Sequence, residues 1–281
     1  MHAWHLRDRT LRIGTRALVM GVVNVTPDSF SDGGRHVRAE AAVAHALRLV
    51  GQGADLLDIG GESSRPGAAP VPLGEELARV LPVVAELARR TAVPLSVDTY
   101  KAEVARACLA AGAHVINDIT ALGGDPAMAA VVREAGAGVI LMHMQGTPAT
   151  MQQAPSYQDV AAEVGQFLEA RLQAAADLGI PRERVALDPG IGFGKTEAHN
   201  LELLARLHEL QRLGRPVVLG VSRKGFLGRI LGRPVGGRAV GSVAAACYAV
   251  ARGAAQVVRA HDVEETHDAV RVLAAIKDWE K

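Results

Sequence analysis

Polar side chains follow a series of short apolar runs along the chain, one group after each run. Asp98, Asn117 and Asp188 supply hydrogen-bond acceptors in three of these groups. A carboxylate or amide oxygen pairs well with a planar N–H/NH₂ edge, as in a guanidine-like heterocycle. These residues therefore predict recognition of a flat, nitrogen-rich ring.

Cationic side chains follow other apolar runs and sit among glycine-rich segments. They are Arg65, Lys224, Arg259 and His261. Cations and the N–H groups of glycine-rich loops suit an anion such as phosphate. Asn24 follows the first run, and its amide oxygen could coordinate Mg²⁺ together with substrate phosphate. The sequence thus predicts one site for a flat ring that carries a polyanion.

A purely local role is the alternative for any one of these residues, because polar residues at strand ends often cap the next helix. Asp118 and Thr99 suit that interpretation, while Tyr100 and Lys101 suit the solvated first turn of a helix. Polar clusters recur after every apolar run, however, and include carboxylates as well as cations. We therefore interpret the whole set as a binding site.

The apolar runs predict the strands that position this site. They are short, rich in Val, Ile and Leu, and not alternating, as is typical of parallel strands buried on both faces. The runs span residues 18–25, 55–59, 94–97, 114–116, 138–142, 184–187, 216–221 and 256–259. Helical spacing fills the stretches between them. We predict an α/β protein with one domain, a TIM (β/α)₈ barrel at 18–281, with residues 1–17 as a hairpin that caps the barrel bottom.

An open, doubly wound sheet is the alternative fold. No Gly-x-Gly-x-x-Gly follows the first run, and nothing in the sequence indicates a second domain. In a barrel, the active site lies at the carboxyl ends of the strands, where all the loops converge. The barrel therefore gathers the acceptors and the cations at one mouth.

Composition limits the partners of this chain of 281 residues. Lys and Arg total 31 against 30 Asp and Glu, and aromatic residues make up 3%, so neither nucleic acid nor a membrane surface is indicated. The longest apolar stretch, near residues 239–251, is shorter than the ~20 residues that span a bilayer. Cys108 and Cys247 have no CxxC partner, and the first residues lack an apolar core of secretory type. We expect a cytoplasmic protein.

Other catalytic motifs find no support. Gly194, Lys195 and Thr196 resemble the end of a phosphate-binding P-loop, but the first glycine of that pattern would fall on Pro189. The chain contains no His-Glu-x-x-His and no Gly-x-Ser-x-Gly. A zinc protease and a hydrolase of that type are therefore not indicated.

Several long motifs resemble the signature segments of the dihydropteroate synthase family, in the expected order. They are residues 20–34, 58–67, 187–196 and 220–226, with shorter matches at 96–101, 116–119, 142–148 and 259–263. The resemblance runs from about residue 18 to 265. It implies an enzyme of folate biosynthesis that joins (7,8-dihydropterin-6-yl)methyl diphosphate to 4-aminobenzoate and releases diphosphate.

The resemblance also implies roles for the acceptors and cations. Asp98, Asn117 and Asp188 would bind the pterin ring edge deep in the barrel. Lys224 would reach the ring carbonyl and a ring nitrogen, and Arg259 would lie against the ring.

The remaining substrate contacts come from the loops. Arg259 and His261 would hold diphosphate oxygens, and Asn24 would bind Mg²⁺ on the diphosphate. Ser64 stands where the family usually has Thr, and it keeps the hydroxyl, so we expect function to be retained. Arg65 is a further candidate for substrate binding. The pocket for 4-aminobenzoate would be formed by Phe30, Pro66, Ser222 and Lys224.

The expected mechanism is an SN1-like loss of diphosphate. The dihydropterin pushes electrons toward the breaking C–O bond while Asp98 and Asp188 support the ring, and Asp32 shields the cationic carbon. The neutral arylamine then attacks without a strong base. The residues that we expect to act in catalysis are Asp32, Asp98, Asp188, Lys224, Arg259 and His261. We also expect the loops at 27–34 and 64–67 to order when diphosphate binds, which predicts that 4-aminobenzoate binds after it.

Two alternatives remain open at this point. A pterin-binding methyltransferase, which passes a methyl group from methyltetrahydrofolate to a corrinoid protein, would need neither the 27–34 loop nor the Ser222-Arg-Lys-Gly motif. A non-catalytic pterin-binding paralogue should have lost Lys224, Arg259, His261 or the first loop, and all are present. The family also implies a homodimer, formed through the last helices around 243–251 and 263–279.

Overall fold

The fold is built around eight parallel strands. The computed structural model describes residues 2–26 and 35–280, with no side chains at 35–38, so Phe30 and Asp32 lie outside the described residues. The strands hydrogen-bond in the order β8-β7-β6-β5-β4-β3-β10-β9. Their bounds are β3 Leu18–Asn24, β4 Leu56–Gly60, β5 Leu95–Asp98, β6 Val115–Asp118, β7 Gly138–Met142, β8 Val185–Asp188, β9 Val218–Leu219 and β10 Val257–Ala260.

The two ends of this sheet meet and close it into a barrel. Leu187 in β8 forms a parallel bridge with Val217, directly before β9. The Leu187 N–H also donates to the carbonyl of Pro216 at 2.9 Å. A closed barrel has no exposed sheet edge, and the predicted (β/α)₈ fold is confirmed.

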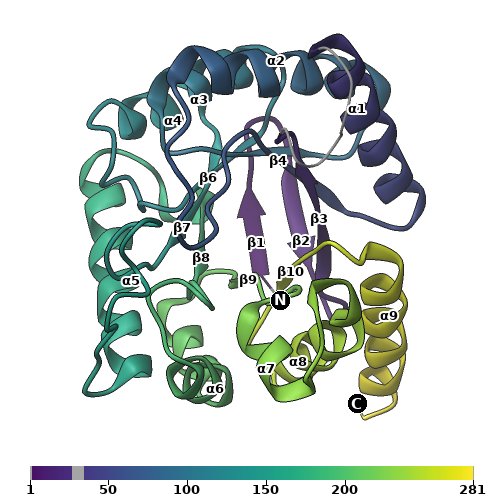
Figure 1. The fold of residues 1–281 in the computed structure, drawn as a ribbon, viewed down its shortest axis with the longest axis vertical. Coiled ribbons are helices and arrows are strands. Elements are labelled where there is room, and N and C mark those ends of the chain that lie inside the picture. Colours follow the sequence, from purple (N-terminus) through teal and green to yellow (C-terminus); the bar gives the residue numbers. More distant parts are fainter. Residues whose placement is uncertain (1, 27–34, 281) are drawn as a thin grey trace.

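Helices surround the barrel as an outer ring (Figure 1). The α-helices are α1 Arg35–Gly51, α2 Leu73–Arg90, α3 Ala102–Ala110, α4 Met128–Ala135, α5 Val160–Asp177, α6 Glu197–Ala205, α7 Gly225–Leu231, α8 Ala239–Ala251 and α9 Val263–Trp279. Short 3₁₀ turns are η2 Arg182–Arg184, η3 Leu207–Leu213 and η4 Val235–Gly237. No helix among the described residues has the length and apolar character needed to cross a membrane.

Alternation along the strands divides the barrel interior into two layers, because successive side chains of a strand point to opposite faces. One buried cluster forms an apolar floor: Met20, Leu56, Val115, Ile140, Ala186, Val218 and Val257. Two residues further along, the same inward face carries a polar layer: Asp58, Asn117, Asp188 and Arg259, with Ser96 paired to Asp58 in the ladder. The outward residues between them pack against the helices. The polar layer thus rests on a dry apolar base.

An antiparallel hairpin covers the amino ends of the strands. It consists of β1 His2–His5 and β2 Thr10–Ile13, and Figure 1 shows it in the middle of the ring. Trp4 is fully buried in the apolar floor, and its indole N–H donates to the carbonyl of Arg184 at 2.9 Å. A Cβ on Gly138 would approach Leu6 Cδ2 to 2.8 Å, so a larger residue at this position of β7 would have to displace the Leu6 side chain.

This packing predicts that Trp4→Ala destabilises the protein by about 3–5 kcal/mol, because it leaves a cavity under the barrel. Leu178→Ala is the control: Leu178, which follows α5, is 48% exposed, and its loss should stay within about 0.5 kcal/mol. Urea unfolding followed by circular dichroism measures both. Equal effects of the two substitutions would show that the hairpin contributes little to stability.

Candidate active site

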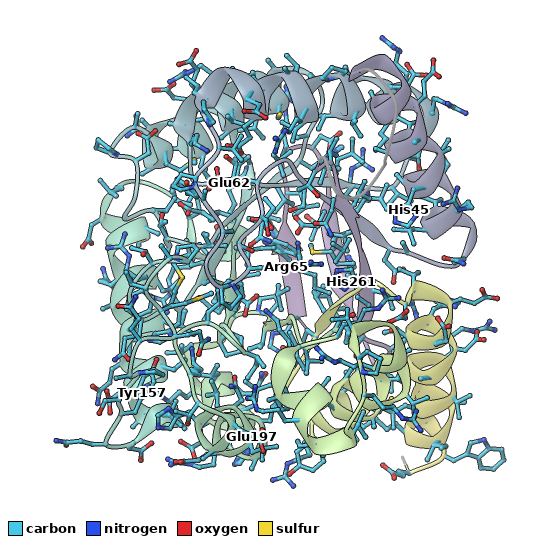
Figure 2. The ribbon with its side chains drawn as sticks, viewed as in Figure 1. His45, Glu62, Arg65, Tyr157, Glu197 and His261 are labelled. Atoms are coloured by element: carbon cyan, nitrogen blue, oxygen red, sulfur yellow. The ribbon has the colours of Figure 1, made fainter. Side chains whose placement is uncertain are left out.

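A cavity of about 880 Å³ opens at the carboxyl ends of the strands. It collects most of the predicted site residues: Asn24, Ser64, Arg65, Pro66, Asp98, Ser222, Lys224, Arg259 and His261. Figure 2 shows Arg65, from the loop after β4, and His261, at the end of β10, near one another in the middle of the ring. Asn117 and Asp188 lie in the polar layer, both nearly completely buried.

Arg259 organises the bottom of this cavity. Its Nε donates to Asp58 Oδ2 at 2.6 Å, and its Nη2 donates to Asp98 Oδ2 at 3.1 Å. Asn117 Nδ2 donates to the same Asp58 oxygen at 3.1 Å. Burial alone would lower the pKa of Arg259, but Asp58 and Asp98 raise it overall. The guanidinium is therefore held as a permanent cation between two carboxylates.

Asp58 is the residue that sequence analysis missed here. It is completely buried, and its Oδ1 has no hydrogen-bond partner among the described residues. The sequence contained an indication of its role, because Asp58 is a charged residue inside the apolar run that forms β4. A buried acceptor without a partner is costly in the free protein. The arrangement suits a ligand that brings a donor to the polar layer.

Asp98 is brought beside the other ring-binding candidates by strand register. It pairs with Gly60 on one side and with Asn117 on the other. Burial and the neighbouring Asp58 raise the pKa of Asp98 to about 7, although Arg259 opposes the shift. Asp98 therefore changes charge in the physiological range.

Asp188 and Lys224 form the opposite side of the site. Asp188 Oδ1 accepts from the Gly190 N–H at 2.7 Å, and burial raises the pKa of Asp188. Burial lowers the pKa of Lys224 to about 8, with Asp188 acting against that shift. The ammonium lies 4.0 Å from the ring centre of Phe193, a cation–π contact that sequence analysis did not include.

His261 does not have the charge predicted for it. Burial, followed by the neighbouring Arg259 and Arg223, lowers the pKa of His261 to about 3, so its imidazole is neutral. The Ser222 hydroxyl lies 3.0 Å from the ring nitrogen Nδ1 of His261, and its oxygen accepts from the backbone N–H of His261 at 3.1 Å. The prediction of a cationic His261 is therefore wrong for this state. A neutral histidine here can act through a single N–H or a ring nitrogen.

The prediction of a solvated first turn at Tyr100 and Lys101 is also wrong. The Lys101 ammonium pairs with Glu62 and Glu76, and the Tyr100 hydroxyl donates to Glu62 Oε1 at 2.6 Å. Glu76 is 1% exposed, so this cluster reaches into the protein. Its partners lie on other elements, which the spacing along one helix could not indicate.

Asp118 and Thr99 do have a local role, but the prediction that they cap the next helix is wrong, because neither α3 nor α4 has a side-chain cap. Asp118 accepts from the N–H groups of Thr120 and Leu122 at 2.8 and 2.9 Å. Thr99 Oγ1 accepts from the Lys101 N–H at 3.2 Å. These side chains hold turns of the chain, as polar residues at strand ends commonly do.

Lys195 is a buried structural residue and not a P-loop lysine. It is 2% exposed, and its Nζ lies 2.9 Å from His143 Nδ1, 3.0 Å from the Gly190 carbonyl and 3.1 Å from that of Phe193. Burial lowers the pKa of Lys195 to about 7 and that of His143 to about 3. The pair therefore braces the loop that carries Phe193.

Asn24 is the donor that the sequence predicts for a metal ion. No group of three or more His, Cys, Asp or Glu side chains suited to a metal exists within the part of the chain that the structure describes. Asn24 ends β3 and lines the cavity. Mg²⁺ usually takes one or two protein oxygens and completes its shell with water and substrate phosphates. A single amide oxygen therefore fits Mg²⁺ carried by a diphosphate.

An acidic polar layer beneath cations at the mouth of a (β/α)₈ barrel defines the class of pterin-binding enzymes, and residues 20–261 match the family model of that name, "Pterin binding enzyme". The dihydropteroate synthase of Escherichia coli (strain K12) is 49% identical over 257 residues, covering 92% of this chain and 90% of that protein. The chain belongs to the dihydropteroate synthase family, a family of transferases.

Solved structures agree with this assignment. Xanthomonas albilineans dihydropteroate synthase with 4-aminobenzoic acid has a TM-score of 0.91 and 52% identity, and the match covers 98% of both chains. The same enzyme in complex with 7,8-dihydropteroate gives a TM-score of 0.89 and 50% identity, again over 98% of both chains. The family predicted from the motifs is confirmed, and the relatives carry the name of the synthase rather than that of a methyltransferase.

The two shifted pKa values predict a bell-shaped pH dependence of pterin binding. Asp98 must lose its proton, near pH 7, to accept from a ring N–H, whereas Lys224 loses its charge near pH 8. Affinity for 6-hydroxymethyl-7,8-dihydropterin should therefore fall below the first value and above the second. Calorimetry between about pH 6 and about pH 9 measures this profile.

Asp98→Asn is the control for the acid side of the profile. It should weaken binding and remove the acid limb, while the alkaline limb stays. An acid limb that persists in Asp98→Asn would assign the titration to another group.

Proposed function

We propose that this protein condenses (7,8-dihydropterin-6-yl)methyl diphosphate with 4-aminobenzoate to give 7,8-dihydropteroate and diphosphate. One observation carries the proposal: a single cavity joins an acidic polar layer to a cationic rim, with Asp98 and Arg259 on its wall and Lys224 and Arg65 around it. The two sets of groups match the two halves of the first substrate. Membership of the synthase family supports the same reaction.

Ring recognition falls to the acceptors of the polar layer. Asp98 and Asp188 accept from the N–H groups of the pteridine, and Asn117, fixed by Asp58, presents its remaining amide oxygen. Lys224 donates to the ring carbonyl and a ring nitrogen. Because the carboxylates lie on the side of the ring that gains positive charge, they stabilise the cation that forms when the leaving group departs.

Departure of diphosphate is the first chemical step. The bond between the methylene carbon and the ester oxygen breaks, the electron pair leaves with that oxygen, and the pteridine nitrogen electrons delocalise the positive charge. Arg65 offers an exposed guanidinium at the mouth. His261 is held by Ser222 and is neutral before the substrate binds. Its ring N–H donates one hydrogen bond to the oxygens of the leaving diphosphate.

Formation of the C–N bond is the second step. The neutral amino group of 4-aminobenzoate attacks the methylene carbon and then loses a proton to water, so no protein base is required. Pro66 and Ser222 line the cavity where this ring would lie. Phe30 and Asp32 keep their predicted roles in the arylamine pocket and beside the cationic carbon, and both lie outside the described residues.

A magnesium ion completes the proposal. Asn24 would hold it together with the substrate's own phosphate oxygens, and the ion would neutralise charge on the leaving diphosphate.

We further propose a homodimer in the cytoplasm. Val272, Ile276 and Trp279 on α9 are 62%, 54% and 92% exposed, which leaves apolar surface for a second copy. Both cysteines are free thiols, as suits a reducing compartment. Light scattering coupled to gel filtration distinguishes a dimer from a monomer.

The test of function supplies the purified protein with dihydropterin diphosphate, 4-aminobenzoate and Mg²⁺. We expect 7,8-dihydropteroate and one equivalent of diphosphate, both detectable by liquid chromatography. Binding of the pterin without turnover would favour a non-catalytic protein. Methyl transfer from methyltetrahydrofolate to a corrinoid protein would favour the methyltransferase alternative.

Ring recognition predicts that Asp188→Ala weakens pterin binding by roughly 2–4 kcal/mol, because a buried N–H of the ligand loses its acceptor. Thr196→Ala is the control. Thr196 caps α6 by accepting from the His199 N–H, and its loss should cost about 1 kcal/mol of stability and leave binding intact. Calorimetry and thermal melts report the two quantities, and equal losses of affinity would refute the site map.

A further inference from the structure

The segment that follows β5 contacts two parts of the site. Asp98 ends the strand and bonds to Arg259 at the polar layer. Tyr100 and Lys101, two and three residues later, contact Glu62 in the loop after β4. The mechanism above uses Asp98 and neither of its two neighbours.

Glu62 closes the loop between β4 and α2 upon itself. Its Oε2 accepts from the Val71 N–H at 3.2 Å, so the side chain at the start of the loop binds the backbone near its end. The same oxygen pairs with the Lys101 ammonium, and Oε1 accepts from Tyr100. The loop base is fastened further by Arg79, whose Nη1 donates to the Gly61 carbonyl at 2.6 Å.

Burial gives this cluster one preferred geometry. Glu76 is 1% exposed, and the side chains of Glu62 and Lys101 are 11% and 18% exposed. Burial alone would lower the pKa of Lys101, yet the bonds to Glu62 and Glu76 raise it. Exposed ion pairs contribute little to structure, but a partly buried, charge-assisted network holds its members in place.

The loop that Glu62 fastens carries the outer wall of the cavity. Ser64, Arg65 and Pro66 all line it, and Arg65 and Pro66 are exposed. Gly67 donates its N–H to the Pro148 carbonyl at 3.0 Å, which joins this loop to the loop after β7. We therefore expect a change at Glu62 to displace the residues at the mouth rather than those of the polar layer.

We propose that Tyr100 and Lys101, acting through Glu62, are positioning residues that set the affinity of the mouth for 4-aminobenzoate. This inference rests on the proposed function. It places ring recognition and arylamine binding on one four-residue segment, with Asp98 serving the first substrate and Tyr100 and Lys101 serving the second.

Three variants test the inference: Tyr100→Phe, Lys101→Met and Glu62→Gln. Lys101→Met and Glu62→Gln should each raise the KM for 4-aminobenzoate about tenfold, because each removes one charge-assisted hydrogen bond. Tyr100→Phe should raise the same KM about threefold. The dissociation constant of 6-hydroxymethyl-7,8-dihydropterin, which lacks the diphosphate, should change less than about twofold. Lys101→Arg keeps the charge and should recover part of the loss.

Arg106→Met provides the matched control on the same helix. Arg106 also pairs with a carboxylate, that of Glu134 at 3.6 Å, but its side chain is 60% exposed. Both constants should stay at the wild-type value in this variant. Tyr100→Phe leaves no buried charge unpaired, so it should not destabilise the fold. Its KM for 4-aminobenzoate therefore tests the positioning role even if Lys101→Met lowers the melting temperature.

The outcomes separate the inference from the function beneath it. Wild-type protein that forms no dihydropteroate refutes the proposed function. Active wild-type protein whose Tyr100→Phe and Glu62→Gln variants keep the KM for 4-aminobenzoate refutes the positioning role. Equal weakening of arylamine and pterin binding also refutes it, because a general loss of structure would then explain the effect.

Discussion

The buried guanidinium of Arg259 is the constraint on which the site depends. Asp58 and Asp98, on the neighbouring strands β4 and β5, would repel each other, and Arg259 bonds to both. Moving such charges out of water is expensive unless they are paired and hydrogen-bonded. Arg259 therefore stabilises two carboxylates that are removed from bulk solvent. The pKa of Asp98 nevertheless stays raised, because burial and Asp58 outweigh Arg259.

The barrel supports this cluster by separating its layers. The apolar floor excludes water from below, while the polar layer lies two residues further along β4, β6, β8 and β10. Both layers arise because every second side chain of a strand points into the barrel. On these four strands, stability and ligand recognition are therefore assigned to neighbouring positions, and a substitution in one layer need not disturb the other.

The sequence predicted the strands well because they are buried on both faces and read as short runs rich in Val, Ile and Leu. It placed Asp98 and Asn117 together because both lie at the carboxyl ends of adjacent strands, where they pair in the ladder. Lys101 was misjudged because its partner Glu62 lies 39 residues away on another loop. The charge of His261 depends on burial beside Arg259, and neither burial nor that neighbour is visible in a linear pattern.

The hairpin beneath the barrel has a consequence for the order of events. Trp4 and its neighbours fill the amino ends of the strands, so among the described residues the cavity is closed at its floor and is reached from the carboxyl ends. The ligand that reaches the bottom must pass the place where its co-reactant will sit. A pteridine arriving second would find its path obstructed, and the joined product has to leave toward the carboxyl ends of the strands, because the floor is closed.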